Sequence, residues 1–430
     1  MAQSPHFFSS QPRARKAFSS LVGSGTASRS YGLDAPRAAN APGGLPILTV
    51  NVLPCSVEGR RKRRSAEQAA TLDPVMAGLG FRPLGWGRLE ARTVPRCAGR
   101  SAHTGDRPNL VVTISPDSVS RPPGPSSRGL PAGWPPEAGW PPEAGWTLMA
   151  TDERGAVWRT ETGWRWLRPG YVLDVPAEGG EATLFPVGES SSPAEREGSG
   201  AFGFRSSIAL AYGVRHALTV LLPRIDWIPI HAAAVELSNE TVLLVGPSGC
   251  GKSTLTMGLV QRGGTLISDD LVALSPPDET GQIAAWSLTR GIRLLPDACN
   301  RFGLAGRPSP VFGRARDKQH VDVGAGRPIP AASPTTVLTP AIADRPQSVL
   351  RALGPATAFP LLARQMLPPM FLSPEALDVQ MRRTANLLRQ CRSARLQAGH
   401  DLYKTPSTLA ELLAAEALVS SSPAQSSSAQ

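Results

Sequence analysis

The fold of this chain is decided by one short stretch, Gly246-Pro247-Ser248-Gly249-Cys250-Gly251-Lys252-Ser253, which has the spacing G-x-x-x-x-G-K-[ST]. Glycines let such a loop curl so that successive N–H groups face phosphate oxygens, and a following helix adds the positive end of its dipole. Lys252 then reaches the β- and γ-phosphates, while the Ser253 hydroxyl ligates Mg²⁺. The stretch therefore predicts a nucleoside triphosphate site that extends through Thr254.

The residues on both sides of this loop support a strand–loop–helix unit. Thr241–Val245 is apolar and β-branched, as a buried strand is, and Thr254–Arg262 contains no proline and spaces its apolar residues for a helix. We also expect strands at His231–Val235 and Thr265–Ser268, the latter after a helix end at Gly263-Gly264. This alternation predicts an α/β core.

Two adjacent acids supply the next candidate site residues. Asp269 and Asp270 end the strand after the loop helix, 17 and 18 residues after Lys252. Strand ends at this edge of an α/β sheet face the ligand crevice, so one carboxylate is predicted to help hold Mg²⁺ and the other to accept the proton of an attacking hydroxyl. The competing interpretation is a turn or helix cap, which aspartate also favours. His231, which starts a predicted neighbouring strand, is a weaker candidate, because a lone histidine is usually structural.

Composition limits the other functions. The chain has 430 residues, a net charge of +11 and a pI near 10.1, but the excess is mostly arginine spread along the chain, so nucleic acid is not the expected partner. The one dense basic cluster, residues 60–64, is interpreted as a solvated segment. Five scattered cysteines indicate a reducing compartment, and no apolar stretch approaches 18 residues. We therefore expect a cytoplasmic protein without a membrane span.

The first third of the chain is expected to hold little regular structure. Residues 1–44, rich in Ser, Ala, Arg and Pro, are predicted to be a disordered tail. Residues 45–121 form a small mixed region of unknown role, with strands at Leu45–Leu53 and Leu110–Ile114 and a helix at Ala66–Leu79. Residues 122–145 contain the repeat Ala-Gly-Trp-Pro-Pro-Glu, whose proline pairs exclude helix and central strand, so this segment is predicted to be an extended linker.

The rest of the chain divides into two predicted domains and a tail. Residues 146–199 read as an antiparallel β-meander of short strands. Residues 200–415 are expected to form the catalytic domain, in which a helix at 206–223 packs on the sheet and a long region at 349–395 is helical. Residues 416–430, rich in Ser, Ala and Gln, are predicted to be a second disordered tail.

These motifs together resemble the HPr kinase/phosphorylase family, whose catalytic domain is related in fold to ATP-dependent phosphoenolpyruvate carboxykinases. The resemblance rests on Ile230-His231-Ala232, the phosphate loop, Ser268-Asp269-Asp270 and Thr289-Arg290-Gly291-Ile292. It is closer still to the HPr-kinase-like proteins often associated with peptide-modification gene clusters. It implies a P-loop-containing PEP-carboxykinase/HPr-kinase-like core at residues 200–415, preceded by a small β-rich region and the disordered N-terminal tail.

The same resemblance assigns roles residue by residue. It implies that Asp270 accepts the proton, that His231 lies beside the transferred phosphate, that Lys252 holds the phosphates, that Ser253 holds the metal, and that Arg290 falls near the active site. Asp269 is then the acid of the pair that is left to help hold the metal. The sequence also departs from the family: Thr254 and Leu288 stand where the family has glutamates, and the Pro- and Arg-rich phosphorolysis loop is not recognisable. These departures leave phosphorolysis, and HPr as the acceptor, unsupported.

The leading hypothesis is an ATP- and Mg²⁺-dependent kinase that phosphorylates a Ser or Thr hydroxyl on a protein or peptide. One rival is an ABC-type ATPase, but the sequence lacks the L-S-G-G-Q signature and the downstream strand ending in Asp-Glu. The other rival is a non-catalytic nucleotide-binding partner in a peptide-modification system, which Thr254 and Leu288 favour. The resembled enzymes form hexamers, and the sequence leaves open whether this chain forms a homo-oligomer.

Overall fold

The computed structural model divides the chain into two units, each described by itself. Unit 1 comprises Met1–Asp34, Gly43–Ile225 and Pro310–Ala315, and unit 2 comprises Ala35–Pro42, Asp226–Ser309 and Arg316–Gln430. The structure describes residues 27–33, 47–52, 81–88, 109–114, 146–152, 155–168, 171–186, 212–238, 240–288, 291–308, 318–323 and 332–421.

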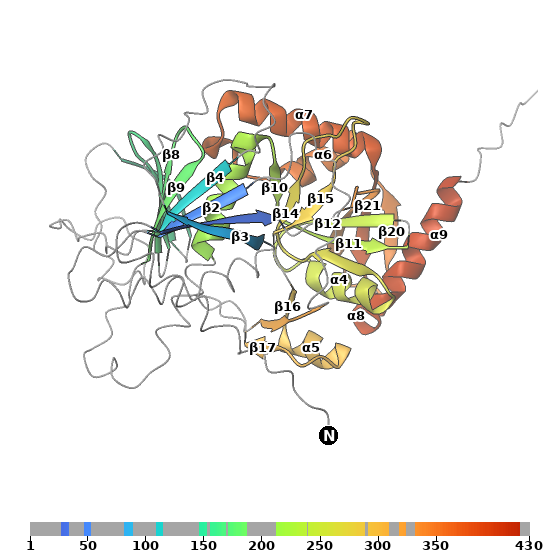
Figure 1. The fold of residues 1–430 in the computed structure, drawn as a ribbon. Coiled ribbons are helices and arrows are strands. Elements are labelled where there is room, and N and C mark those ends of the chain that lie inside the picture. The colour runs from blue at the N-terminus through green and yellow to red at the C-terminus, as the bar shows by residue number, and fades with distance from the viewer. Residues whose placement is uncertain are drawn as a thin grey trace, which may run out of the picture. The chain divides into compact units, whose positions relative to one another are not determined.

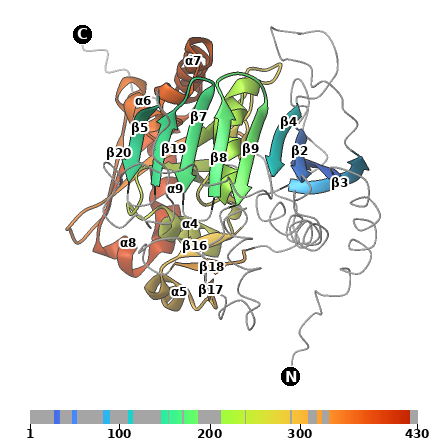
Figure 2. The same ribbon diagram turned by 90° about the vertical axis from the view of Figure 1, so that its left-hand side faces the viewer.

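Unit 1 contains a nine-stranded sheet in the order β3-β1-β2-β4-β9-β8-β7-β6-β5. The strands from β5 to β9 pair antiparallel in sequence order, as the predicted meander requires, and Figure 2 shows β7, β8 and β9 side by side. The strands are β1 (Ala27–Leu33), β2 (Ile47–Val52), β3 (Phe81–Arg88), β4 (Asn109–Ile114), β5 (Thr147–Asp152), β6 (Gly155–Arg159), β7 (Gly163–Arg168), β8 (Tyr171–Pro176) and β9 (Glu181–Pro186).

One prediction for this region is wrong, two are confirmed, and three features lie outside the described residues. Residues 1–44 were expected to be a disordered tail, yet Ala27–Leu33 forms β1, because β2 and β3 pair with it on both sides and satisfy its backbone groups. The strands expected at Leu45–Leu53 and Leu110–Ile114 are confirmed as β2 and β4. The helix expected at Ala66–Leu79, the basic cluster and the proline repeat lie outside the described residues.

The helix expected at 206–223 is described over residues 212–221, and it belongs to unit 1 rather than to unit 2, which holds the phosphate loop. Gly213 allows the helix to approach the meander closely, since a Cβ there would lie 2.3 Å from Cδ1 of Leu184. The rings of Trp166 and His216 contact each other at a tilt of 48°, with centroids 5.2 Å apart. Contacts with β7 and β9, which its apolar spacing does not reveal, therefore decide where this helix packs.

Unit 2 is built on a six-stranded sheet in the order β13-β11-β12-β19-β21-β20. Strands β12, β19 and β21 are parallel to one another. Strand β13 runs in the same direction, because β13 and β12 each pair antiparallel with β11, which lies between them. The strands are β11 (Ala232–Leu237), β12 (Glu240–Val245), β13 (Thr265–Ser268), β19 (Thr336–Ile342), β20 (Val349–Ala352) and β21 (Arg392–Ala398).

Helices cover both faces of this sheet and make a three-layer α/β/α arrangement (Figure 1). Ala232 and Ala234 face a core cluster with α6 and α7, whereas Ala233 and Val235 face a second cluster with α4, α8 and α9. This alternation follows from the period of two along a strand that is buried on both faces. The helices are α4 (Lys252–Gln261), α6 (Pro355–Ala363), α7 (Pro374–Gln390), α8 (His400–Lys404) and α9 (Leu409–Ser421).

The region at 349–395, expected to be helical, is so only in its middle. It begins with β20 and ends in β21, which pair antiparallel at the edge of the sheet. The hydrogen bonds of this pairing fix these residues as strands, although the spacing of their apolar residues suggested a helix. Helix α9 also continues to Ser421, into the segment expected to be a tail.

Two small three-stranded sheets complete unit 2. One has the order β10-β14-β15, and the other has the order β16-β18-β17. The second packs Ile292, Leu294 and Val321 into a core cluster with Met257 of α4 and with α5. The elements are β10 (Ile228–Ile230), β14 (Val272–Leu274), β15 (Ala285–Ser287), β16 (Ile292–Leu294), α5 (Pro296–Phe302), β17 (Arg307–Pro308) and β18 (Gln319–Val321). Within the described residues, no helix has the length and apolar character needed to span a bilayer.

Candidate functional site

Strand direction brings the predicted site residues to one edge of the unit 2 sheet. The phosphate loop follows the carboxyl end of β12, and Asp269 follows the carboxyl end of β13. His231 directly precedes β11, which runs the opposite way, so the start of β11 lies at this same edge between the other two. Ligand sites in α/β sheets form at this kind of edge.

The loop has the backbone conformation that its glycines allow. Gly249 and Gly251 adopt φ values of 87° and 94°, which L-residues with a side chain rarely adopt. Helix α4 begins at Lys252, directly after the loop, so its free N–H groups and dipole face the loop. The predicted strand–loop–helix unit is therefore present.

Lys252 lies buried within this loop. Its Nζ donates hydrogen bonds to the carbonyl oxygens of Gly246 at 2.6 Å and Pro247 at 3.0 Å. Burial lowers the pKa of Lys252, while the nearby charges of Cys250, Asp270 and Asp269 raise it. The ammonium group is therefore held among carbonyl oxygens, beside both acids.

Asp269 is a buried acid with one unused oxygen. Its Oδ2 accepts a hydrogen bond of 2.9 Å from the backbone N–H of Arg293, whereas its Oδ1 receives no hydrogen bond from any residue that the structure describes. Burial raises the pKa of Asp269, the charge of Asp270 raises it further, and the Arg293 N–H and the Ser253 hydroxyl lower it. A cation placed at Oδ1 would offset the cost of this buried charge.

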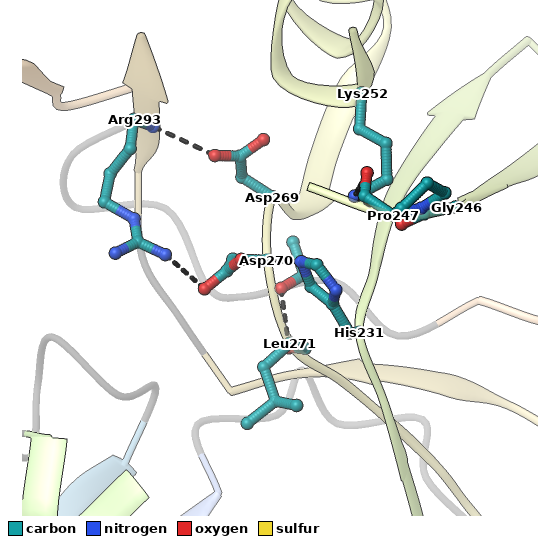
Figure 3. Close-up of polar contacts among 9 residues, drawn as sticks. His231, Gly246, Pro247, Lys252, Asp269, Asp270, Leu271 and Arg293 are labelled. Carbon is teal, nitrogen blue, oxygen red and sulfur yellow. Dashed lines mark hydrogen bonds and ion pairs between the residues drawn. The ribbon is translucent and has the colours of Figure 1, made fainter. Parts of the chain in front are cut away.

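Asp270 is held from both sides. Its Oδ1 lies 3.2 Å from Nε2 of His231, and its Oδ2 forms an ion pair with the guanidinium of Arg293 (Figure 3). The turn that carries the two acids is closed by the Ser268 hydroxyl, which donates to the carbonyl oxygen of Leu271 at 2.8 Å. The carboxylate is thus oriented, and its side chain remains 18% exposed.

The structure brings together His231, the loop, Lys252, Asp269 and Asp270 in one place, as the sequence predicts. Arg290 lies outside the described residues. Leu288, which stands where the resembled family has a glutamate, is fully buried, and its N–H donates to the Leu271 carbonyl at 3.1 Å. That position therefore packs into the core and offers no ligand group to the site.

Sequence reasoning missed Arg293 and Lys318. Arg293 contacts both acids, one through its backbone and the other through its side chain, and Lys318 is close enough to lower the pKa of Lys252. A signal for Arg293 exists in the chain, because it separates the two apolar residues of β16, Ile292 and Leu294, and alternation places it on the opposite face of that strand. The sequence around Lys318 has no comparable alternation of apolar residues that would single it out.

A cavity of about 520 Å³ adjoins the loop. It is lined by the start of the loop, the carboxyl end of β19, Arg395 of β21 and the last turn of α6. Gln365, at this end of α6, accepts a 2.8 Å hydrogen bond from the backbone N–H of His231.

The residues present fit a magnesium ion that is shared with a substrate. Among the described residues no group of three or more His, Cys, Asp or Glu side chains could hold a metal alone. Asp269 and Ser253 nevertheless supply a free carboxylate oxygen and a hydroxyl side by side, and Mg²⁺ is commonly held by one or two protein groups together with substrate phosphates.

Comparison with known proteins supports this picture for one segment. The model of the family described as HPr Serine kinase C-terminal domain matches residues 226–287. The chain is 51% identical over 81 residues to an HPr kinase/phosphorylase of Lactobacillus acidophilus, which covers 17% of this chain and 25% of that relative. It is 42% identical over 55 residues to an HPr kinase/phosphorylase of Chlorobium luteolum, which covers 13% of this chain and 17% of that relative.

The similarity is therefore local, since the chain spans a quarter or less of the length of these curated relatives. The solved structure of the Hpr(Ser) kinase/phosphatase from Coxiella burnetii aligns with 45% of this chain and 97% of its own, at 17% identity and a TM-score of 0.23. Over the segment that carries His231, the phosphate loop and the acid pair, this chain is similar to HPr kinases.

Proposed function

We propose that this protein is an ATP-dependent kinase that transfers the γ-phosphoryl group to a Ser or Thr hydroxyl of a protein or peptide, and that unit 2 is a P-loop core of the PEP-carboxykinase/HPr-kinase type. One observation carries the proposal: a phosphate loop with a buried lysine lies beside two acids, of which one has a free oxygen and the other is oriented by two partners. The local similarity to HPr kinases agrees with it.

The loop and Lys252 bind and stabilise the phosphates in this proposal. Lys252 exchanges its carbonyl contacts with Gly246 and Pro247 for phosphate oxygens, which are stronger partners for an ammonium group. The N–H groups of the loop and of the first turn of α4 bind the same oxygens. These donors are fixed before the substrate arrives, so they stabilise the charge that spreads over the transferring group at little reorganisation cost.

Asp270 acts as the proton acceptor. The acceptor hydroxyl loses its proton to the Asp270 carboxylate as its oxygen bonds to the γ-phosphorus, and the bond between that phosphorus and the β–γ bridging oxygen breaks to release ADP. His231 and Arg293 hold the carboxylate in position for this transfer. Positioned general bases of this kind contribute about 10²- to 10⁴-fold to rate.

Asp269 and Ser253 would hold Mg²⁺. When bound, the ion would neutralise negative charge on the phosphates. The chain prepares for it by keeping Asp269 buried, with Oδ2 anchored to the Arg293 N–H and Oδ1 unused.

A non-catalytic nucleotide-binding protein is the second candidate. Two observations favour it: Leu288 is buried where the family has a glutamate, and Arg293 occupies one oxygen of the proposed base. A phosphate-transfer assay separates the two functions directly.

The assay supplies γ-labelled ATP, Mg²⁺ and an array of peptides that each carry one central Ser or Thr. We expect label on a subset of peptides with the wild-type chain, and a loss of at least about 100-fold with Lys252→Ala, because the phosphates lose their buried cation. Lys404→Ala is the matched control, since Lys404 is an exposed lysine of α8 away from the loop, and it should keep full activity.

Transfer that Lys252→Ala leaves unchanged would rule out this site as its source. ATP binding that depends on Lys252, with no label on any peptide or on the chain itself, would support the non-catalytic function instead.

A further inference from the structure

Arg293 contacts both acids of the site from a strand that lies beyond the segment matched by the family model. Its backbone N–H donates to Oδ2 of Asp269 at 2.9 Å, and its guanidinium pairs with Oδ2 of Asp270. The family match ends at residue 287, whereas β16 starts at Ile292. Resting on the proposed function, we propose that Arg293 is a catalytic residue, whose guanidinium binds the transferring phosphoryl group as Asp270 takes up the proton.

The small sheet of β16, β17 and β18 turns the Arg293 side chain toward the site. Ile292 and Leu294 pack into the core cluster with α4 and α5, so alternation along β16 places Arg293 on the opposite face. Figure 3 shows the two acids between Arg293 on one side and Lys252 on the other. A phosphoryl group that passes from the loop to a hydroxyl at Asp270 therefore moves between two cations.

The same face of this sheet carries a second positive charge. His320 lies directly opposite Arg293 in the β16–β18 pairing, and Lys318, two residues before His320, falls on the same face by alternation. Burial lowers the pKa of Lys252, and the charge of Lys318 lowers it further, so this face adjoins the phosphate loop. The β16–β18 face thus presents Arg293 and Lys318 to the place where the phosphates are proposed to lie.

The charge on Asp270 changes during the proposed reaction, and this change gives Arg293 its catalytic effect. Before transfer, the guanidinium and the Asp270 carboxylate form a neutral pair. When the carboxylate takes the proton of the acceptor hydroxyl, that pair is left with a net positive charge, while negative charge spreads over the oxygens of the transferring group. Arg293 therefore attracts the transition state more strongly than the ground state, which is the kind of interaction that raises the rate of the chemical step.

A role limited to positioning Asp270 would leave this charge unused. The other oxygen of Asp270 is held by His231, and Ser268 closes the turn that carries the acid. A guanidinium beside a carboxylate favours the ionised form, so an arginine that only held the base would oppose proton uptake. Binding of the phosphoryl group offsets that effect, and the planar fork of N–H donors on a guanidinium matches phosphoryl oxygens.

Binding of a phosphoryl-transfer mimic to the full chain tests the proposal without measuring turnover. MgADP with aluminium fluoride, which forms a planar anionic group in the place of the transferring phosphoryl group, is titrated by calorimetry, and MgATP is titrated separately. We expect Arg293→Ala to weaken binding of the fluoride complex by at least about 30-fold and binding of MgATP by less than about fivefold. Arg293→Gln, which keeps a donor for Asp270 but no charge, should show the same contrast, and thermal unfolding checks that each variant is folded.

The Asp270→Asn background separates a catalytic arginine from a positioning one. It contains no carboxylate to hold, so a positioning residue would have no further effect there, whereas we expect Arg293→Ala to weaken the fluoride complex by at least about tenfold again. Arg392→Ala is the matched control. Arg392 pairs with Glu240 through the same guanidinium nitrogen at the amino ends of β21 and β12, the opposite edge of the sheet from the site, so this variant should bind both ligands as the wild type does.

The outcomes separate this inference from the proposed function. A loss of the fluoride complex that disappears in the Asp270→Asn background would make Arg293 a positioning residue, and the inference would be wrong while the proposed function stands. Equal binding of the fluoride complex by Arg293→Ala and the wild type would also overturn the inference. If the wild type binds the fluoride complex no more tightly than MgADP alone, the site does not stabilise a transferring phosphoryl group, and the proposed function fails together with the inference.

Discussion

At the scale of single residues, the site buries a carboxylate, and burial makes its charged form unfavourable in the folded protein. Asp269 is 3% exposed, and burial raises its pKa above the ordinary value for aspartate. A raised pKa in the folded state means that stability is highest when both folded and unfolded chains are protonated, and that it falls as the pH rises through the folded pKa. Ionised Asp269 therefore lowers the folding stability of the metal-free protein at neutral pH, and it does not do so in acid, where the carboxyl group is protonated.

Asp269→Asn tests this cost. The amide oxygen still accepts from the Arg293 N–H but carries no charge, so at pH 7 without Mg²⁺ the variant should gain about 1 kcal/mol of stability, or roughly 2–4 °C in Tm. The gain should shrink toward zero as the pH falls below the ordinary pKa of aspartate. Thermal unfolding followed by circular dichroism across pH measures it. A variant less stable than the wild type at pH 7 would show that the carboxylate is already compensated in the free protein.

In the presence of Mg²⁺ and ATP, the wild type should become more stable than Asp269→Asn. They stabilise the wild type by binding only the folded state, and the variant lacks the charged ligand. A thermal shift with MgATP that is equal in both proteins would exclude Asp269 as a metal ligand.

At the scale of elements, a single turn aligns the strand that touches both acids. Gly291 has a φ of 73° and directly precedes β16, which carries Arg293. A Cβ on Gly291 would lie 2.6 Å from Cε1 of His320 and 2.7 Å from the carbonyl oxygen of Val321. The β16–β18 pairing is therefore tight at this point because position 291 is glycine.

Gly291→Ala should lose about 2–4 kcal/mol of stability, from backbone strain together with the displaced β18. It should also reduce phosphate transfer, since Arg293 would no longer hold both acids. Gly303→Ala is the matched control: its φ is 65°, but a Cβ there meets nothing within 4 Å, so it should cost about 1 kcal/mol and leave transfer unchanged. Chemical denaturation and the labelled-ATP assay measure the two effects. Equal losses of stability and transfer in Gly291→Ala and Gly303→Ala would show that close β16–β18 pairing at position 291 is not needed for either property.

Elements that are set by local sequence patterns could be predicted, and elements that are set by distant partners could not. The loop, β12, β13 and the acid pair come from local patterns, because a glycine-rich loop between a strand and a helix has its own spacing. The packing of helix 212–221 was predicted wrongly and strands β20 and β21 were predicted as helix, because partners far along the chain decide both. Arg293 was missed for a related reason: its role comes from the return of β16 to Asp270, a contact across 23 residues.

At the scale of the whole molecule, the residues of the site all lie within unit 2. His231, the loop, both acids and Arg293 fall between Asp226 and Ser309, and the cavity adds residues of β19, β21 and α6 from the same unit. The family match also begins at residue 226, the first residue of this unit after Ile225. Nucleotide binding is therefore expected to be a property of unit 2 alone.

A fragment of residues 226–430 tests this expectation. It retains both core clusters of the unit 2 sheet and should fold cooperatively and bind MgATP within about threefold of the full chain, because no group proposed to contact nucleotide is removed. Calorimetric titration and thermal unfolding provide the comparison. A folded fragment with no affinity for ATP would show that unit 1 contributes to the site.

The most direct test of the whole account measures binding and transfer together in Asp270→Asn. We expect an ATP dissociation constant within about threefold of the wild type, because the loop and Lys252 are intact, and a transfer rate at least about 100-fold lower, because the hydroxyl loses its base. Asp378→Asn, an exposed acid on α7, should match the wild type in both measurements. Transfer at the wild-type rate by Asp270→Asn would contradict the account.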